Sequence, residues 1–425
     1  MIKKKLVFIQ LNEINFDELK KYSKNYNFKF FNDSFFKKLS TTTSEDKYEL
    51  LEPWIQWVSI YTGLEAEKHK IFRLGDSENK SLVQFYELIE KKGYNVGAIG
   101  PINLKNNLKN SLYYVPDPWS KSNSDNKWIN KIISSTIKKF VNENSSHNKS
   151  FYDYIKLLFI TLVYFRFNNF NLLLKLLINI NHHWNKALLF EFIINNIHIK
   201  KIKKFNPDFS SIFLNSGAHI QHHYYFNSKF TNNIANPNWY IESKCDPIFE
   251  MFKFYDEILL EYSNNSKYDL ILATGLRQVP YDRVKYYYRL KNHKEFLDKL
   301  NIFYNDVIPK MSRDFIIYFD NQKKLQDAKN IFTQINIINK RTIFNFEERK
   351  NSIFVTLSIN EEITDDFLLF LDKDKKIQFS KCVNFIALKN GMHDKKGYFY
   401  SNFDCPLMKN DSHVKNIYTT INNYF

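Results

Sequence analysis

The run KLVFIQL at residues 5–11, followed directly by NEIN at residues 12–15, decides the fold prediction. A continuous apolar run of this length is typical of a strand that is buried on both faces of a parallel sheet. The runs SIFL at 211–214 and DLILA at 269–273 repeat the pattern, and helical patterns such as residues 53–62 and 246–263 separate them. Strands that alternate with helices predict an α/β fold with a doubly wound, mainly parallel sheet.

Residues 128–205 differ in character from the rest of the chain. They contain no Gly or Pro, and Leu, Ile and Phe recur at helical spacing, which predicts an all-helical insertion. We therefore expect a first part of the α/β domain at 1–127, a basic helical insertion at 128–205, and a second part of the α/β domain at 206–425. In this last part the pattern predicts a helix over 322–332, an extended segment at 335–337 and short strands towards the C-terminus.

Composition and charge restrict the classes of partner. The chain has 425 residues, 44% hydrophobic and 25% charged, which is typical of folded globular proteins. Its net charge is +16, and residues 130–205 hold 12 Lys/Arg against 3 Asp/Glu. This surplus favours an anionic small-molecule or glycan substrate and peripheral contact of residues 130–205 with a membrane. A coding bias towards Lys, Asn, Ile, Phe and Tyr is the alternative cause. No nucleic-acid module is recognisable, so we expect no nucleic-acid partner.

Targeting features point to the cytoplasm. The N-terminus reads as a first strand rather than a signal peptide. The longest apolar run, at 157–165, is shorter than the roughly 20 residues that a membrane-spanning helix needs. The three cysteines share no CxxC spacing, which indicates a reducing compartment. We therefore expect a cytoplasmic protein, with membrane association through residues 130–205 as an option.

Chemistry-bearing residues follow the predicted strands. Ligands bind beyond the carboxyl ends of strands in open α/β sheets. Glu13 follows the first strand, the segment NSGAHIQHH follows SIFL, and Arg277 follows DLILA. The pair His393-Asp394 follows a late strand. These side chains are predicted to meet at one edge of the sheet.

Three clustered histidines carry the sharpest signal. His219, His222 and His223 stand at i, i+3 and i+4, so they share a face if the loop enters a helix. Two of them could bind one divalent metal, zinc above all, with Glu13 or His393 completing the site. The alternatives are metal-free contact with an anionic substrate, or packing among the aromatic residues that follow. For Glu13 the alternative is a helix-capping role.

The segment EPWIQW at 52–57 places a carboxylate at the start of a helix. Glu52 is therefore a candidate general base, as is Glu13, and an ordinary helix cap is the alternative for Glu52. We expect Trp54, Gln56 and Trp57 to contact substrate. Arg277 could hold phosphate or sulfate oxygens through its bidentate guanidinium.

Asp394 is a further candidate for substrate binding, because it stands beside His393 in the chain. His69 and Asp76 are interpreted as structural residues of a loop.

The order of these pieces resembles the alkaline phosphatase superfamily, especially its nucleotide pyrophosphatase/phosphodiesterase and sulfatase-like branch. Glu13 stands at the acidic metal ligand after strand one, and residues 57–64 with 67–71 resemble the following helix and turn. AHIQHH at 218–223 resembles the family's Asp-His-x-x-His stretch, and His393-Asp394 its final His-Gly. The resemblance covers about residues 1–125 and 205–425, and it implies an alkaline phosphatase-like fold.

Several family positions carry other residues here. Ala218 replaces the aspartate before the histidines, Thr274 to Arg277 replaces a ligand-bearing turn, and Pro53 stands in place of the nucleophile. The resemblance thus implies at most one metal site. It implies a hydrolase or transferase for a phosphate or sulfate ester, such as a surface glycan or a lipid-linked sugar in polysaccharide biosynthesis. The alternative is an inactive relative that binds an anionic glycan or a partner at a membrane surface.

Overall fold

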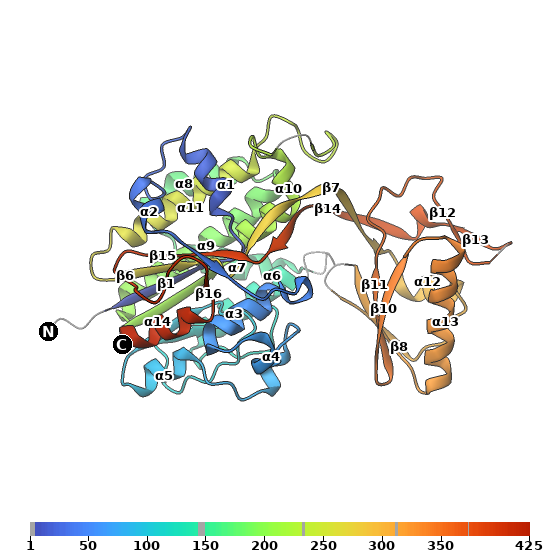
Figure 1. Cartoon of the computed structure of the whole chain (residues 1–425), viewed down its shortest axis with the longest axis horizontal. Helices are drawn as coiled ribbons and strands as arrows, with labels where there is room; N and C mark the ends of the chain where they lie inside the picture. Colours follow the sequence, from blue (N-terminus) through green and yellow to red (C-terminus); the bar gives the residue numbers. More distant parts are fainter. Residues whose placement is uncertain (1–4, 143–148, 232–233, 311–312, 373) are drawn as a thin grey trace. The chain divides into compact units, whose positions relative to one another are not determined.

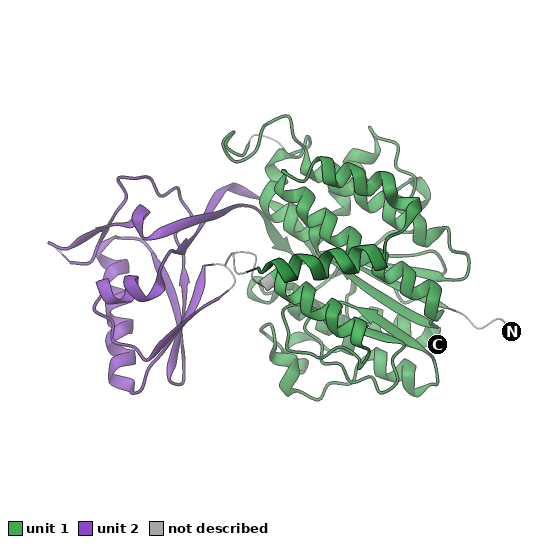
Figure 2. Ribbon diagram, turned by 180° about the vertical axis from the view of Figure 1, so that it is seen from behind, with its two compact units in different colours: residues 1–280, 391–425 green, residues 281–390 purple. Residues whose placement is uncertain are grey.

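The computed structural model describes residues 5–142, 149–231, 234–310, 313–372 and 374–425. The chain forms two compact units, which Figure 2 shows in different colours. Unit 1 comprises residues 1–280 and 391–425, and unit 2 comprises residues 281–390.

Unit 1 is built on an eight-stranded sheet with the order β16-β2-β15-β6-β1-β5-β3-β4 (Figure 1). The central strands β6, β1, β5, β3 and β4 run parallel, and β15 is antiparallel to β2 and β6. The predicted α/β fold with a mainly parallel sheet is therefore confirmed. The strands are β1 (Leu6–Leu11), β2 (Ser40–Thr43), β3 (Val96–Ile99), β4 (Tyr113–Val115), β5 (Phe209–Leu214), β6 (Asp269–Ala273), β15 (Lys396–Ser401) and β16 (Ser412–His413).

Both faces of this sheet are covered. Val7 and Ile9 of β1 belong to one hydrophobic cluster, and Leu6 and Phe8 belong to another on the opposite face, because successive side chains of a strand point to opposite sides. The first face is covered by α1 (Phe16–Ser23), α2 (Asp33–Lys38), α6 (Trp128–Asn142), α7 (Phe151–Val163), α8 (Phe170–Ile178), α9 (His183–Phe205), α10 (Ser216–Tyr224) and α11 (Pro247–Ser263). The second face is covered by α3 (Pro53–Thr62), α5 (Phe85–Lys91) and α14 (Asn416–Tyr424), with the short α4 (Ala66–His69) next to α3.

The helices α6 to α9 occupy the segment predicted as a helical insertion. They do not form a separate core. Phe192 and Ile197 of α9 are buried in the same cluster as the β1 side chains Val7 and Ile9, so α9 is part of the layer that covers the sheet.

Unit 2 has its own core. Its four-stranded antiparallel sheet has the order β10-β11-β9-β8, and its buried side chains form a separate cluster. The sequence predicts one continuous part at 206–425, whereas residues 281–390 form a unit of their own with a separate buried cluster. The elements are α12 (His293–Lys299), β8 (Asp306–Pro309), β9 (Asp314–Tyr318), α13 (Gln322–Ile338), β10 (Phe344–Arg349), β11 (Ser352–Leu357), β12 (Leu368–Phe370) and β13 (Lys376–Gln378).

Two strands run from unit 1 into unit 2. These are β7 (Arg277–Leu290) and β14 (Val383–Asp394), which pair as a two-stranded sheet.

One local prediction is wrong. Residues 335–337, expected to be extended, belong to the last turn of α13. Ile335 is buried on the helix face that includes Leu325 and Phe332, and this packing outweighs the weak preference of isoleucine for strands.

Candidate metal centre

Glu13 lies where three neighbouring parallel strands end. It follows β1, and Asn215 and Thr274 follow the flanking strands β5 and β6. Its φ is 62°, in the left-handed region that non-glycine residues seldom adopt. Backbone hydrogen bonds hold it there: Glu13 N donates to Thr274 O at 3.1 Å, and Gln278 N donates to Glu13 O at 3.1 Å. Backbone strain of this kind is concentrated at functional sites.

Three metal-ligand atoms converge beside this strand end. The atom Oε2 of Glu13 lies 3.2 Å from Nε2 of His222 and 3.1 Å from Nε2 of His393. Ligand atoms of these three residues all lie within 4.8 Å of one another. The group joins the end of β1, the helix α10 and the strand β14, so residues 380 positions apart meet.

Amide side chains fix the Glu13 carboxylate. Asn12 Nδ2 donates to Oε1 at 2.8 Å, and Gln278 Nε2 donates to Oε2. Burial alone would raise the pKa of the Glu13 carboxyl, but His393 and His222 outweigh burial and hold this pKa well below its ordinary value. The carboxylate is therefore ionised and points at the two imidazoles.

A hydrogen bond on the far side of the His222 ring and a carboxylate beside the far side of the His393 ring indicate how the imidazoles face Glu13. His222 Nδ1 lies 3.0 Å from the carbonyl oxygen of Gly391, which can only accept, so this nitrogen carries the hydrogen. His393 Nδ1 lies 3.6 Å from Oε2 of Glu52, and a hydrogen on Nδ1 suits a carboxylate neighbour. Both Nε2 atoms then direct their lone pairs at the Glu13 carboxylate, which repels them. The three converging atoms therefore need a cation among them, either a metal ion or protons on the rings.

The donor set fits a zinc ion. Two histidine nitrogens and one carboxylate oxygen are a known ligand set of catalytic zinc, with a position left open for water. A tetrahedral ion with bonds of about 2.0–2.1 Å separates its ligands by about 3.3 Å, close to the 3.1 and 3.2 Å found here. The hydrogen bond of His222 to the Gly391 carbonyl matches the outer partner that a metal-bound histidine has, and the Glu52 carboxylate lies 3.6 Å from the corresponding nitrogen of His393.

Gly391 permits the close approach of β14 to α10. A Cβ atom at this position would lie 2.8 Å from the carbonyl oxygen of Gln221 and 2.2 Å from Oε1 of Gln278. Only glycine lets the carbonyl oxygen of residue 391 reach the His222 ring without displacing these neighbours.

The other two predicted histidine ligands lie outside the three-donor group of the described residues. The His219 and His223 rings contact each other edge to face, with centroids 4.7 Å apart. Since they lie one helical turn apart on α10, they are neighbours on that helix.

Arg277 and Asp394 are engaged with each other. The Nε of Arg277 donates to Asp394 Oδ1 at 3.0 Å, and its Nη1 donates to Asp17 Oδ2 at 2.5 Å. Burial alone would lower the pKa of Arg277, but Tyr398 and Asp394 outweigh burial and raise this pKa. In this structure the guanidinium therefore joins carboxylates, where the sequence had predicted a phosphate or sulfate.

The predicted substrate-binding residues of α3 have structural contacts. Trp57 is fully buried and donates from Nε1 to Asn12 Oδ1 at 2.8 Å, so it helps to position the residue that holds Glu13. Gln56 is also fully buried, and it donates to Leu50 O at 2.7 Å. Trp54 donates to Phe72 O at 3.1 Å.

Glu52 is not an ordinary cap. Although it precedes the first residue of α3, its side chain makes no capping hydrogen bond and instead approaches His393. The side chain is 33% exposed, so it is accessible to a water molecule beside the three-donor group.

His69, the last residue of α4, and Asp76 have the structural role that the sequence predicts, because both hold the backbone of the segment between them. His69 Nδ1 accepts from Ile71 N at 3.0 Å, and Asp76 Oδ2 accepts from Arg73 N at 2.9 Å.

Sequence reasoning missed the polar residues that support the centre. Asn12, Gln221 and Gln278 are buried, and each bonds Glu13; Gln221 Nε2 donates to Glu13 O at 2.9 Å. All three lie within the motifs that supplied the predicted ligands. A buried polar residue next to a predicted ligand is the signal that could have found them, because buried polar groups need partners.

Glu191 of α9 is a further missed residue. Its carboxylate accepts from Ser216 N at 2.7 Å and from the Tyr255 hydroxyl at 3.3 Å, so it holds the first turn of the helix that carries His222. Burial raises the pKa of Glu191 to about 8. The segment predicted as an insertion thus positions α10.

Comparisons with solved structures find matches over nearly the whole chain, at low sequence identity. Phosphonoacetate hydrolase from Sinorhizobium meliloti 1021 is 10% identical with a TM-score of 0.45, covering 100% of this chain and 96% of its own. Murine ectonucleotide pyrophosphatase/phosphodiesterase 5 is 12% identical with a TM-score of 0.42, covering 98% and 93%. Alkaline phosphatase from the Antarctic bacterium TAB5 is 8% identical with a TM-score of 0.40, covering 100% and 98%.

No protein-family model and no curated protein sequence matches the chain. The chain's own eight-stranded, mainly parallel sheet establishes the α/β fold, and its chemistry has to be read from its own residues.

Proposed function

We propose that this chain is a hydrolase of phosphate or sulfate esters that uses one divalent metal ion, zinc above all. The observation that supports this most is the convergence of Glu13, His222 and His393 at the carboxyl ends of the central strands. Two histidines and one glutamate leave room in the zinc coordination sphere for water or substrate. The ester class is inferred from the motif order described above, with phosphorylated or sulfated glycans and lipid-linked sugars as the substrates to test first.

The metal, when bound, would act as a Lewis acid on the ester oxygen and lower the pKa of a bound water. Glu13 supplies the negative charge of the ligand set, and His222 and His393 direct their Nε2 atoms at it. Glu52 is the general base in this proposal, because its partly exposed carboxylate lies beside His393 and can accept a proton from the attacking water.

Water is the nucleophile in this proposal. Helix α3 begins with Glu52-Pro53, so it presents no hydroxyl at its first turn. The buried pair of Ser59 and His69, at 3.1 Å, cannot replace it. His69 Nδ1 accepts from Ile71 N, so Nε2 carries the hydrogen and cannot take a proton from Ser59.

The test compares His222→Ala with His223→Ala in purified full-length protein. Both substitutions remove one imidazole from α10, but only His222 belongs to the three-donor group. We expect His222→Ala to lose bound metal and turnover of aryl phosphate, phosphodiester and sulfate ester substrates, while His223→Ala keeps both. Equal metal content and equal turnover in the two variants would contradict the proposal.

A second candidate is binding of an anionic glycan or partner without turnover. The ion pairs of Arg277 with Asp17 and Asp394 favour the absence of turnover. The guanidinium is occupied by these carboxylates, so it is not free to stabilise charge on a reacting ester. Calorimetry with a phosphorylated glycan, in parallel with the turnover assay, separates the two: binding that depends on His222 without product supports the second candidate.

A further inference from the structure

Helices α7 and α8 expose an unusual amount of apolar surface. Many of their apolar side chains are exposed to solvent, and so is Phe167 of η3 (Phe167–Asn169), which lies between them. In globular proteins such large apolar side chains are more often buried. The most exposed are Phe167 at 86%, Phe151 at 77%, Tyr152 at 73% and Ile178 at 71%. Contiguous exposed apolar surface of this kind marks an interaction site.

The geometry of these helices bears on what they contact. Among the described residues, no single helix is long and apolar enough to cross a membrane, while the pair 151–163 and 167–178 meets the length and composition criteria together and is bent by 110°. Each of the two helices is long enough to lie in the boundary between headgroups and acyl chains.

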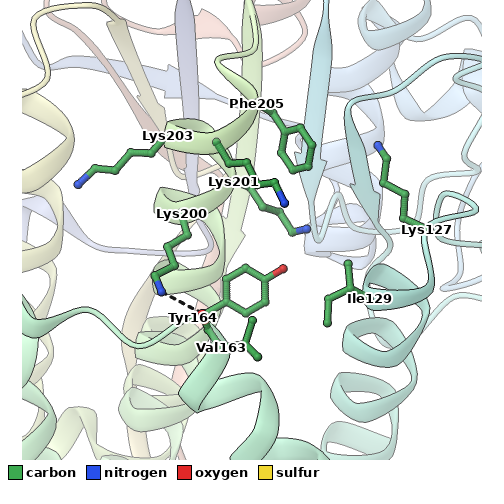
Figure 3. Close-up of a pocket in the computed structure, with 9 residues that line it drawn as sticks. Lys127, Ile129, Val163, Tyr164, Lys200, Lys201, Lys203 and Phe205 are labelled. Atoms are coloured by element: carbon green, nitrogen blue, oxygen red, sulfur yellow. Dashed lines mark hydrogen bonds between the residues drawn. The ribbon is translucent and has the colours of Figure 1, made fainter.

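A cavity of about 440 Å³ lies at the end of α7. Five lysines contribute to its lining, and the described lining residues include no Asp or Glu; the lysines are Lys127, Lys200, Lys201, Lys203 and Lys204. Lys127 and Lys201 both lie near the Phe205 ring, with Nζ atoms 5.3 and 5.9 Å from its centroid (Figure 3). A concave surface that gathers this much positive charge beside aromatic rings suits an anionic group with an attached apolar part.

Lys201 is the least hydrated of these lysines. It is 2% exposed, donates to Asn130 Oδ1 at 2.5 Å, and lies 5.5 Å from the centroids of the Tyr113 and Tyr164 rings. Burial lowers the pKa of its ammonium group to about 8. An anion in the cavity would offset the desolvation of this charge.

The lysine cavity and the apolar helices meet at one place. Val163, the last residue of α7, and Tyr164 both line the cavity, and Lys200 Nζ donates to Val163 O at 2.9 Å (Figure 3). An anionic lipid offers the same juxtaposition, with a phosphate directly above acyl chains. A free phosphate would account for the lysines but would leave the exposed Phe and Leu side chains unexplained.

We propose that residues 151–178 lie in the surface of a membrane and that the lysine cavity, defined by Lys127, Lys200, Lys201, Lys203 and Lys204, binds the phosphate of an anionic lipid. This inference goes beyond the proposed hydrolase function and does not depend on the metal centre. In this proposal the excess of Lys and Arg over Asp and Glu in residues 130–205 serves to bind a lipid headgroup.

Flotation with vesicles of phosphatidylcholine alone or with added phosphatidylglycerol tests the proposal on the full chain. Lys127→Gln/Lys204→Gln removes two exposed cavity lysines, and Lys186→Gln/Lys253→Gln removes two exposed lysines outside the cavity lining. A lysine near an anionic membrane strengthens binding about fivefold, so we expect the cavity pair to weaken flotation about 25-fold and the control pair to have a smaller effect.

Substitutions on α7 test the apolar part separately. Leu158→Gln/Leu162→Gln changes two exposed leucines of α7, and Ile337→Gln/Leu407→Gln changes two exposed side chains elsewhere. We expect only the α7 pair to abolish flotation. Circular dichroism and turnover in solution should match the wild type in all four variants, because these residues are exposed and lie outside the metal centre.

Three results would overturn the proposal. The first is equal flotation with and without phosphatidylglycerol, and the second is equal loss in the cavity and control pairs. The third is saturable binding of glycerol phosphate that needs Lys127 and Lys204 while vesicles do not bind, which would assign the cavity to a soluble phosphate compound.

Discussion

Replacing Gln278 by methionine removes one of the amide groups that hold Glu13 while keeping the volume of the side chain. Gln278 is fully buried, and its Nε2 donates to Glu13 Oε2 and, at 3.0 Å, to Ala218 O. Its Oε1 has no hydrogen-bond partner among the described residues. The substitution therefore deletes two hydrogen bonds, one of them to a charged group, and also removes an unpaired buried carbonyl.

These two effects offset each other in the metal-free protein. The hydrogen bond to Glu13 contributes about 1.5–3 kcal/mol and the one to Ala218 O about 0.5–1.5 kcal/mol, whereas an unpaired buried polar group costs about 1–3 kcal/mol. We therefore expect the free energy of unfolding without metal to change by no more than about 3.5 kcal/mol. Loss of an outer hydrogen-bond partner weakens metal binding about 10- to 100-fold, which corresponds to about 1.4–2.7 kcal/mol.

Gln56→Met provides a matched control. Gln56 is fully buried, donates from its amide to a backbone carbonyl and has an unpaired Oε1, as Gln278 does, but its donor bonds Leu50. Zinc affinity is measured by competition with a chromophoric chelator, and stability by thermal denaturation with and without EDTA. A zinc affinity of Gln278→Met within about twofold of Gln56→Met would refute the assignment of the amide network to a metal.

Three further substitutions have defined outcomes. Gly391→Ala would place a Cβ 2.8 Å from Gln221 O, so we expect a lower melting temperature and weaker zinc binding, measured with the same two assays. Glu191→Gln should flatten the pH dependence of stability. The folded state raises the pKa of Glu191 from 4.5 to about 8, so the wild type loses stability relative to the variant as pH rises between these values; parallel melting curves from pH 5 to pH 8 would contradict this. Arg277→Gln should cost less than about 1 kcal/mol, with the loss shrinking at high salt, because its partners Asp17 and Asp394 are partly exposed; a salt-independent loss in urea denaturation would show that the pair is not electrostatic.

Local patterns were sufficient for the central elements. The apolar run of β1 identifies a buried strand because both of its faces pack against helices. Helix α3 begins at Pro53 and ends before Gly63, whose φ is 71°. Proline favours the first position of a helix and glycine the position after its last turn, each through its own backbone preference. These features depend on neighbours in the chain, so they can be read without the tertiary structure.

The ligand positions were accessible for a related reason. Glu13 follows β1, and His222 lies on α10, the helix that follows β5; the carboxyl edge of the sheet is where α/β folds bind ligands. The sequence could not separate His222 from His219 and His223, because the choice depends on which imidazole faces β14.

Tertiary structure alone decided the rest. The amide partner of Glu13 is Gln278, which lies 265 positions away, and no local periodicity reports such a pair. The same holds for the separate core of residues 281–390 and for Lys201, whose burial depends on Tyr113 and Tyr164 from other elements. The periodicity of a helix or strand shows which of its faces is buried and which is exposed to water. The contacts that determine pKa values and ligand geometry arise only when distant segments pack together.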